Sequence, residues 1–133
     1  MKLIKICILL FCLAQMSVKS IAQEHNRIVN SPSVIHVVLF KFSDQAKPIQ
    51  IVQLMSEIKG LKGKIKGIQA ISFGHNFSER SKGYTHAASI TFADSQALKL
   101  FIANPFHQQL IKNSIKPILA EMIVLDYVDN ANL

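Results

Sequence analysis

The sequence predicts an α+β domain in which helices cover one face of a four-stranded antiparallel sheet. Three observations support this class. Four stretches rich in β-branched and aromatic residues have the composition of strands. Apolar residues at helical spacing follow the first and the third of these stretches. The 133-residue chain has neither an internal repeat nor a low-complexity tract, so its length fits one domain.

The first 22 residues resemble a secretory signal peptide and are set apart from the domain. Two lysines precede the apolar run at residues 6–14, and Ser20, Ile21 and Ala22 give the small-x-small pattern of a cleavage site. The apolar run is shorter than the roughly 20 residues that a membrane span needs. We therefore expect a signal peptide at residues 1–22, a periplasmic or secreted mature protein, and no stable membrane anchor.

Removal of this segment changes the charge and the cysteine content. Cys7 and Cys12 leave with it, so the mature chain has neither a disulfide nor a thiol nucleophile. Three of the 15 basic residues also leave, and 12 remain against 8 acidic residues, a net charge of about +4. The aromatic residues are not interleaved with basic ones, as a nucleic-acid surface would require. We expect no nucleic-acid partner.

The domain is expected at residues 34–130, after a polar and flexible lead-in at residues 23–33. Its first strand, Val34–Phe42, is unusual because both of its faces are apolar. One face carries Val34, Val38, Phe40 and Phe42, and the other carries Ile35, Val37 and Leu39. Such a strand must be covered on both sides.

A helix and two strands are expected next. Pro48 suits a first helical turn. An apolar stripe follows it at three- and four-residue steps, formed by Val52, Met55, Ile58, Leu61 and Ile65. Glycines then end the helix before a second strand at residues 68–76, and a polar loop leads to a third strand at residues 84–92.

Two further helical segments and a last strand complete the order. Asp94 caps a short helix, and Asn104-Pro105 breaks it and starts another at residues 105–115. The final strand is expected at residues 122–128. The resulting order β-α-β-β-α-β is that of a ferredoxin-like fold. Because no third layer covers the second face of the first strand, we expect a homodimer that packs sheet face to sheet face.

Four segments resemble the Dabb family, the stress-responsive α/β-barrel proteins: IHVVLFKF, KGYTHAASITF, NPFH and VLDYV. The resemblance runs from Val34 to Val128. Its most specific part is Gly-Tyr-Thr-His followed about twenty residues later by Pro-x-His. The resemblance implies a dimeric α/β barrel, in agreement with the two-sided first strand. It implies little about function, because a fold does not fix one.

Three histidines lie on apolar faces of the predicted elements. His36 and His86 share their strand faces with apolar residues, and His107 looks inward from the last helix. If the first and third strands are neighbours, His36 and His86 can be adjacent, with His107 closing over them. They are either hydrogen-bonded structural residues or a site. His25 and His75 share no row with these three.

Two chemistries are open for such a site. Three neutral imidazoles can form an open zinc or iron site. However, no H-x-x-x-H or H-x-H spacing exists, and no acidic residue accompanies the histidines on their faces. We therefore expect neither a metal nor a cofactor. Acid–base chemistry fits an apolar pocket better, because histidine exchanges protons near neutral pH.

The resemblance also favours acid–base chemistry. Plant polyketide cyclases of this family use the Pro-x-His histidine as the base of an aldol cyclisation, and His107 stands at that position. His36 and His86 match other pocket histidines of these cyclases. Where the cyclases carry tyrosines on two helices, this chain has Ile58 and Phe101, which argues against polyketide cyclisation itself. We expect a substrate-binding wall that includes Tyr84, Phe101, Ile58, Val38 and Phe40.

Three functions remain open at this point. The first is a pocket for a small hydrophobic or aromatic molecule, with lyase- or cyclase-type acid–base chemistry at His107, His86 and His36. The second is a non-catalytic binding or stress-related protein whose histidines are structural. The third is a metal- or haem-associated dimeric barrel. Pocket volume separates the first two, because a drug-sized ligand needs roughly 300 Å³ and a cavity under about 100 Å³ excludes it.

Overall fold

The computed structural model describes residues 32–129 of the chain. The predicted signal peptide, residues 23–31 of the predicted lead-in, and residue 130 of the predicted domain lie outside the described residues. Within residues 32–129, none of the helices combines the length and the apolar character that a membrane crossing demands.

Strands and helices follow one another in the predicted order. They are β1 (Val34–Phe42), α2 (Pro48–Gly60), the 3₁₀ turn η1 (Leu61–Gly63), β2 (Ile68–His75), β3 (His86–Phe92), α3 (Ser95–Ala103), α4 (Pro105–Leu110), the π-helical turn η2 (Ile111–Ile115) and β4 (Leu119–Val128). β3 begins later than predicted, because Tyr84 lies in a turn that its N–H closes onto the carbonyl of Ser81. β4 begins earlier, because its pairing with β1 continues past a bulge to Leu119.

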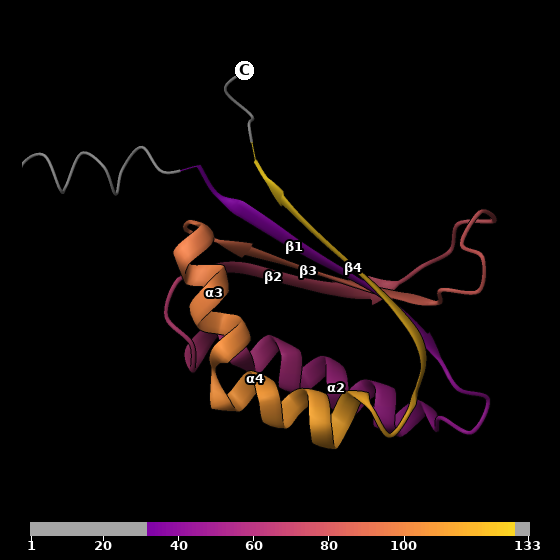
Figure 1. Cartoon of the computed structure of the whole chain (residues 1–133). Coiled ribbons are helices and arrows are strands. Elements are labelled where there is room, and N and C mark those ends of the chain that lie inside the picture. The colour runs from indigo at the N-terminus through magenta and orange to yellow at the C-terminus, as the bar shows by residue number, and fades with distance from the viewer. Residues whose placement is uncertain (1–31, 130–133) are drawn as a thin grey trace, which may run out of the picture. The chain divides into compact units, whose positions relative to one another are not determined.

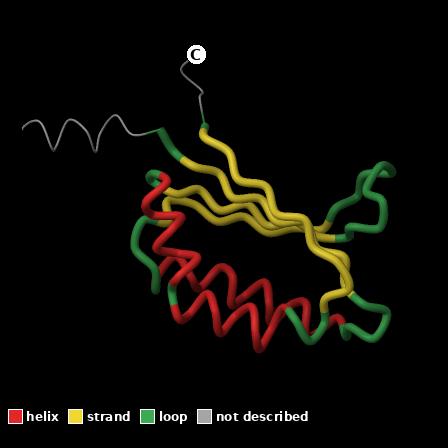
Figure 2. Tube along the Cα trace, in the orientation of Figure 1, coloured by secondary structure: helices red, strands yellow, loops and turns green. Residues whose placement is uncertain are grey.

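The four strands form one antiparallel sheet in the order β2-β3-β1-β4. The helices lie on one face of this sheet, as Figures 1 and 2 show. The predicted ferredoxin-like arrangement is confirmed. The sheet of one chain is open, with β2 and β4 at its edges, so a closed barrel requires a second chain.

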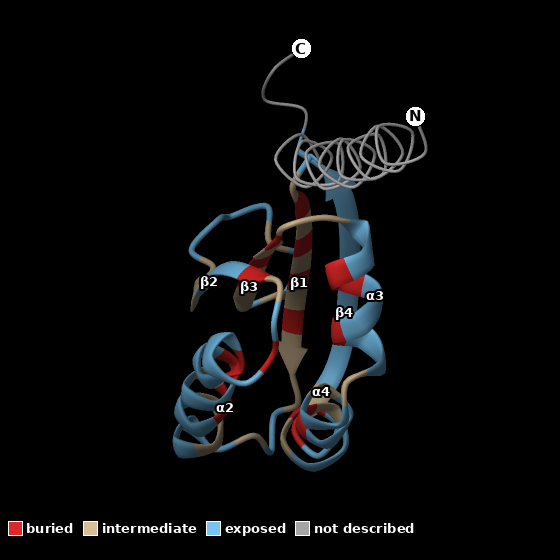
Figure 3. Ribbon diagram, turned by 90° about the vertical axis from the view of Figure 1, so that its left-hand side faces the viewer, coloured by how far each residue is buried: buried red, intermediate tan, exposed pale blue. Residues whose placement is uncertain are grey.

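β1 is two-sided, as its sequence predicts. Val34, His36, Val38 and Phe40 are buried toward the helices, and the residues between them point to the other face. There they lie opposite apolar residues of β4. We call this set the outer apolar face; it comprises Ile35, Val37, Leu39, Ile123, Leu125 and Tyr127. Its members on β4 are between 45% and 55% exposed, and Figure 3 draws that strand in the colour of exposed residues.

The apolar stripe of α2 differs in part from the predicted one. Leu54 and Ile58 are the buried residues of this helix, whereas Val52 is 57% exposed. Residues four apart share a helix face, so burying Leu54 together with Ile58 turns Val52 away from the sheet. The prediction is correct for Ile58, Leu61 and Ile65, all of which belong to the core.

Local caps fix the helices that follow β3. Asp94 accepts a hydrogen bond from the N–H of Ala97 at 2.7 Å, which confirms the predicted N-cap. Asn104 accepts one from the N–H of Phe106 at 2.9 Å, and Pro105 occupies the first turn of α4. His107 therefore lies in a first helical turn whose start is specified by the sequence itself.

Candidate active site

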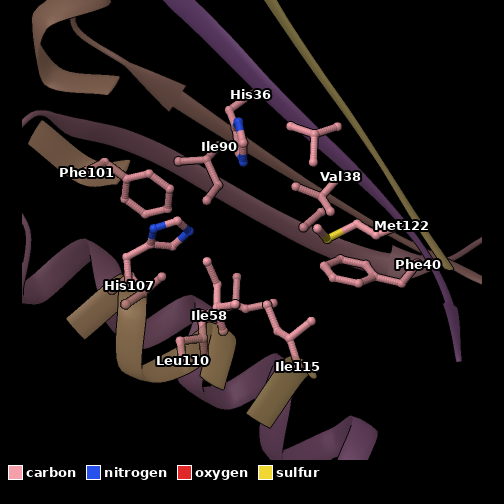
Figure 4. A pocket seen from close by; sticks show the side chains of 14 residues that line it. His36, Val38, Phe40, Ile58, Ile90, Phe101, His107, Leu110, Ile115 and Met122 are labelled. Carbon is pink, nitrogen blue, oxygen red and sulfur yellow. The ribbon is translucent and has the colours of Figure 1, made fainter. Parts of the chain in front are cut away.

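A cavity of about 110 Å³ lies between the sheet and the helices (Figure 4). Four of the predicted wall residues line it: Val38 and Phe40 from β1, Ile58 from α2 and Phe101 from α3. The rest of the wall is also apolar, apart from His36 and His107. Met122 and Val124 of β4 complete it and are 40% and 46% exposed, so the cavity reaches solvent beside β4.

His36 enters this cavity from the centre of β1 and is paired with a carboxylate. Its Nδ1 lies 2.5 Å from Oδ1 of Asp126, which stands directly opposite it on β4. The histidine is 7% exposed, whereas the Asp126 side chain is 42% exposed. Phe101 approaches the imidazole edge-on, with 5.8 Å between ring centroids. The carboxylate holds the ring in place through Nδ1, which leaves Nε2 as the nitrogen free to exchange a proton with a ligand.

His107 faces the same cavity from the helix layer (Figure 4). Its ring lies against Phe101, with 4.0 Å between centroids, and its Nδ1 is 3.4 Å from the carbonyl oxygen of Ile102. Burial lowers the pKa of His107 below 6.5, the hydrogen bond to Ile102 opposes this shift, and the charge of His36 adds to it. His107 is therefore neutral at pH 7 and able to accept a proton.

His86, expected in the same pocket, does not line the cavity. In the β1–β3 ladder His36 stands opposite Ile90, whereas His86 stands opposite Phe40. The offset along the strand carries His86 away from His36, although both point to the same face of the sheet. Its ring neighbours are His75, Phe42 and Phe73. Burial, and then the charge of His75, lower the pKa of His86.

The expectations for His75 and Tyr84 are also wrong. His75 was expected to share no row with the other histidines, yet it stands directly opposite His86. Tyr84 does not line the cavity either, because it precedes β3 in a turn. Its hydroxyl donates to Glu121 at 3.3 Å, and Lys41 donates to the same carboxylate at 2.9 Å. The Tyr84 hydroxyl is therefore hydrogen-bonded in a cluster with Lys41 and Glu121, outside the cavity.

Asp126 is the site residue that the sequence analysis missed. We expected no acidic residue beside the histidines, because none accompanies them on the faces of their own strands and helix. The signal lies in VLDYV, where Asp126 lies on the same face of the last strand as Val124 and Val128. Only the register between β1 and β4, which the sequence does not state, puts Asp126 opposite His36.

The histidines of the cavity suit proton transfer. Among residues 32–129, no three histidine, cysteine, aspartate or glutamate side chains group closely enough to hold a metal ion together. Two imidazoles facing an apolar space, one of them fixed by a carboxylate, can serve as a base and an acid. Fold and cavity thus define a ferredoxin-like α+β protein with a histidine-bearing pocket between sheet and helices.

Comparison with known proteins assigns this class to a family. Residues 34–129 match the Dabb family, the Stress responsive A/B Barrel Domain, and the chain belongs to it. A stress-response A/B barrel domain-containing protein of Arabidopsis thaliana is 25% identical over 100 residues, 74% of this chain. The chain spans only 37% of that relative. Olivetolic acid cyclase of Cannabis sativa is 25% identical over 77 residues, 56% of this chain and 76% of the cyclase.

Solved structures agree with the fold. The hydroxynitrile lyase of Passiflora edulis matches with a TM-score of 0.70 at 23% identity, over 74% of this chain and 94% of the lyase. A dimeric ferredoxin-like protein of unknown function from Thermobifida fusca matches with a TM-score of 0.65 at 19% identity, over 74% of this chain and 92% of that one. The chain is thus similar in sequence to a protein named as a cyclase and similar in fold to one named as a lyase, both at low identity.

Proposed function

We propose that this protein binds a small, mainly apolar molecule between sheet and helices and performs lyase- or cyclase-type acid–base chemistry on it. His107 is the base, and His36 with Asp126 is the partner that returns a proton. The observation that carries the proposal is that two imidazoles face one apolar cavity, one packed against Phe101 and the other held by a carboxylate. His86 and Tyr84 take no part in it.

The chemistry follows from the different surroundings of the two rings. A neutral imidazole in an apolar wall removes a proton readily, and the surrounding low dielectric strengthens its interaction with the charge that develops. The carboxylate of Asp126 fixes the orientation of His36 through its Nδ1. The relatives named as olivetolic acid cyclase and hydroxynitrile lyase support this reaction class. The cavity of this chain is lined by no tyrosine, so its chemistry rests on the histidines.

The size of the cavity limits the ligand. An apolar cavity of about 150 Å³ holds a benzene ring, and the present one is about 110 Å³. It fits a short aliphatic chain or part of a single ring, and a larger molecule extends past Met122 and Val124 toward solvent. A drug-sized ligand of several rings is excluded from the closed part of the cavity.

A specific observation favours a second candidate, a binding protein without catalysis. The Nδ1 of His36 is already bonded to Asp126, which is how a purely structural histidine is satisfied. In that case His107 lines the cavity without exchanging protons with the ligand. The two candidates share the ligand class and differ only in turnover.

Turnover is tested with two small probes. Mandelonitrile cleavage, followed by benzaldehyde absorbance, tests the lyase reaction, and deuterium exchange beside the carbonyl of phenylacetaldehyde, followed by NMR, tests proton abstraction. We expect His107→Ala to slow the active probe by about 10² to 10⁴, the usual worth of a general base. His75→Ala is the matched control and should retain the rate. An equal rate in folded His107→Ala protein would refute the assignment of the base, and binding without turnover would select the second candidate.

The proposal includes a periplasmic or secreted location, brought about by cleavage of residues 1–22. The intact mass of protein from its native host should correspond to a chain that starts near Gln23 and lacks Cys7 and Cys12. A mass that retains both cysteines would instead assign the N-terminal segment to an anchor or to an uncleaved extension.

A further inference from the structure

Two histidines outside the cavity form a pair on adjacent strands. His75 is the last residue of β2 and His86 the first of β3, and the two stand directly opposite each other. Their ring centroids are 5.2 Å apart and the rings are nearly perpendicular, at 87°. Directly opposite residues point to the same face of a sheet, with Cβ atoms about 5 Å apart. Both imidazoles can therefore reach one point between them.

The surroundings of the pair leave that point open to water. His75 is exposed and His86 is half-buried. Phe42 and Phe73 form the wall behind His86, with centroids 5.2 Å and 5.8 Å from its ring. These neighbours supply neither a positive charge that repels a cation nor a hydrogen bond that occupies both ring nitrogens.

One ring nitrogen of His86 has a hydrogen-bond partner of the kind that metal ligands use. Oγ1 of Thr85 lies 3.0 Å from Nδ1 of His86. When Nδ1–H donates to this hydroxyl oxygen, Nε2 keeps its lone pair for an ion. Metal-binding histidines commonly have their second nitrogen anchored in this way, which fixes the tautomer and the ring orientation.

We propose that His75 and His86 form a two-imidazole site for a divalent transition-metal ion, with water in the remaining coordination positions. Imidazole suits copper(II), nickel(II) and zinc(II), and the general order of affinity puts copper(II) first among them. No third protein ligand joins the pair within residues 32–129. The site is therefore a peripheral and exchangeable one, separate from the cavity with His36 and His107.

A metal ion bound by His75 and His86 would link β2 and β3 at the base of the long loop that connects them. The loop between β2 and β3 projects beyond the end of the sheet in Figure 1, and it is closed by the N–H of Asn76 donating to the carbonyl of Thr85 at 2.7 Å. An ion held by His75 and His86 joins the same two strands one residue further in. Because only the folded chain offers both ligands together, the metal should stabilise the fold.

The test is a thermal melt of the full chain with and without millimolar nickel(II), combined with a nickel(II) titration by calorimetry. We expect nickel(II) to raise the Tm of the unaltered protein and to have little effect on His75→Ala. Because His75 is exposed, this variant should fold, so the result does not depend on the more buried His86. Copper(II) should give an electron paramagnetic resonance spectrum with two nitrogen ligands in the unaltered protein and one in His75→Ala.

Two controls separate this site from others. His107→Ala and His25→Ala should keep the nickel(II) affinity, whereas Thr85→Val should lower it about tenfold, the usual worth of a residue that orients a metal ligand. Unchanged affinity in both His75→Ala and His86→Ala would overturn the proposal. Loss of affinity in His25→Ala alone would place the ion on the N-terminal segment and would overturn it as well.

Discussion

At the scale of single residues, the central question is why an apolar strand face contains a histidine. A buried polar group that lacks a hydrogen bond is costly, so His36 needs a partner to be tolerated among Val34, Val38 and Phe40. Asp126 meets this need from the neighbouring strand at 2.5 Å. The same pairing that makes His36 acceptable in the core also orients it toward the cavity.

The first prediction concerns this pair. Asp126→Ala removes the partner of Nδ1 and leaves a polar atom of His36 unsatisfied at a 7% exposed residue. We expect a loss of about 1–3 kcal/mol in the free energy of unfolding, measured by urea denaturation. Asp126→Asn is the matched control, since its amide oxygen can still accept the bond and should preserve most of the stability. Equal stability of the alanine and asparagine variants would mean that the pair contributes nothing to the fold.

The second prediction concerns the pH dependence of stability. Burial lowers the pKa of His107 below its ordinary 6.5, so at acidic pH the unfolded chain binds this proton more readily than the folded one. The contribution of the neutral ring is fully present above pH 6.5 and is lost as the pH falls through the lower folded pKa. His107→Gln should therefore show a shallower loss of unfolding free energy between about pH 7 and pH 5 than the unaltered protein. Parallel slopes in the two proteins would contradict the assigned direction.

At the scale of elements, local signals account for what the sequence could predict. The helix starts agree with expectation, because each depends on a residue next to the start itself. These residues are Pro48 in α2, Asp94 before α3 and Asn104 before α4. The errors arose where the answer depends on distant partners. Whether Asp126 meets His36 is decided by the register between strands. The same holds for His86, whose place along β1 removes it from the cavity.

The start of β3 was also predicted incorrectly, because it depends on a turn. The alternation of apolar and polar residues predicted a strand that begins at Tyr84, with the Tyr84 phenol in the pocket wall. A turn bond from Tyr84 to Ser81 ends the regular alternation there, and the hydroxyl instead meets Glu121 of β4. Six residues of the candidate site, His36 and His107 with four apolar wall residues, were thus predictable from face and spacing. The remainder required the register and the turn geometry.

The third prediction concerns Gly67, which immediately precedes β2 and lies against Ala97 of α3. Gly67 has φ of +87°, and a Cβ atom added there would lie 2.6 Å from Cβ of Ala97. Gly67→Ala therefore combines an unfavourable backbone conformation with a steric clash. We expect a loss of about 1–3 kcal/mol in the free energy of unfolding by urea denaturation.

A second glycine supplies the control for this substitution. A Cβ added at Gly63 meets nothing within 4 Å, so Gly63→Ala should change the free energy of unfolding by no more than about 0.5 kcal/mol. Similar small effects at both positions would show that β2 and α3 can move apart to accommodate a side chain.

At the scale of the whole molecule, the open sheet leaves an apolar surface uncovered. Leu125 is 55% exposed and Tyr127 47%, and they lie beside Val37 and Ile35 of the central strand. Large contiguous apolar patches on soluble proteins usually mark interaction sites. A second copy of the same sheet is a fitting cover, because two sheets can pack face to face with their side chains interleaved. The dimeric relative from Thermobifida fusca has the same fold.

The last prediction tests this cover with one substitution at two places. Val37→Lys places a charge in the middle of the outer apolar face, where burial without a partner costs several kcal/mol. We expect monomer or aggregate by light scattering, in contrast to a dimer of the unaltered protein. Val52→Lys introduces the same charge on α2, at a residue that is already 57% exposed, and should leave the dimer intact. If both variants remain well-folded dimers, the two copies associate through another surface, and the outer apolar face needs a different partner.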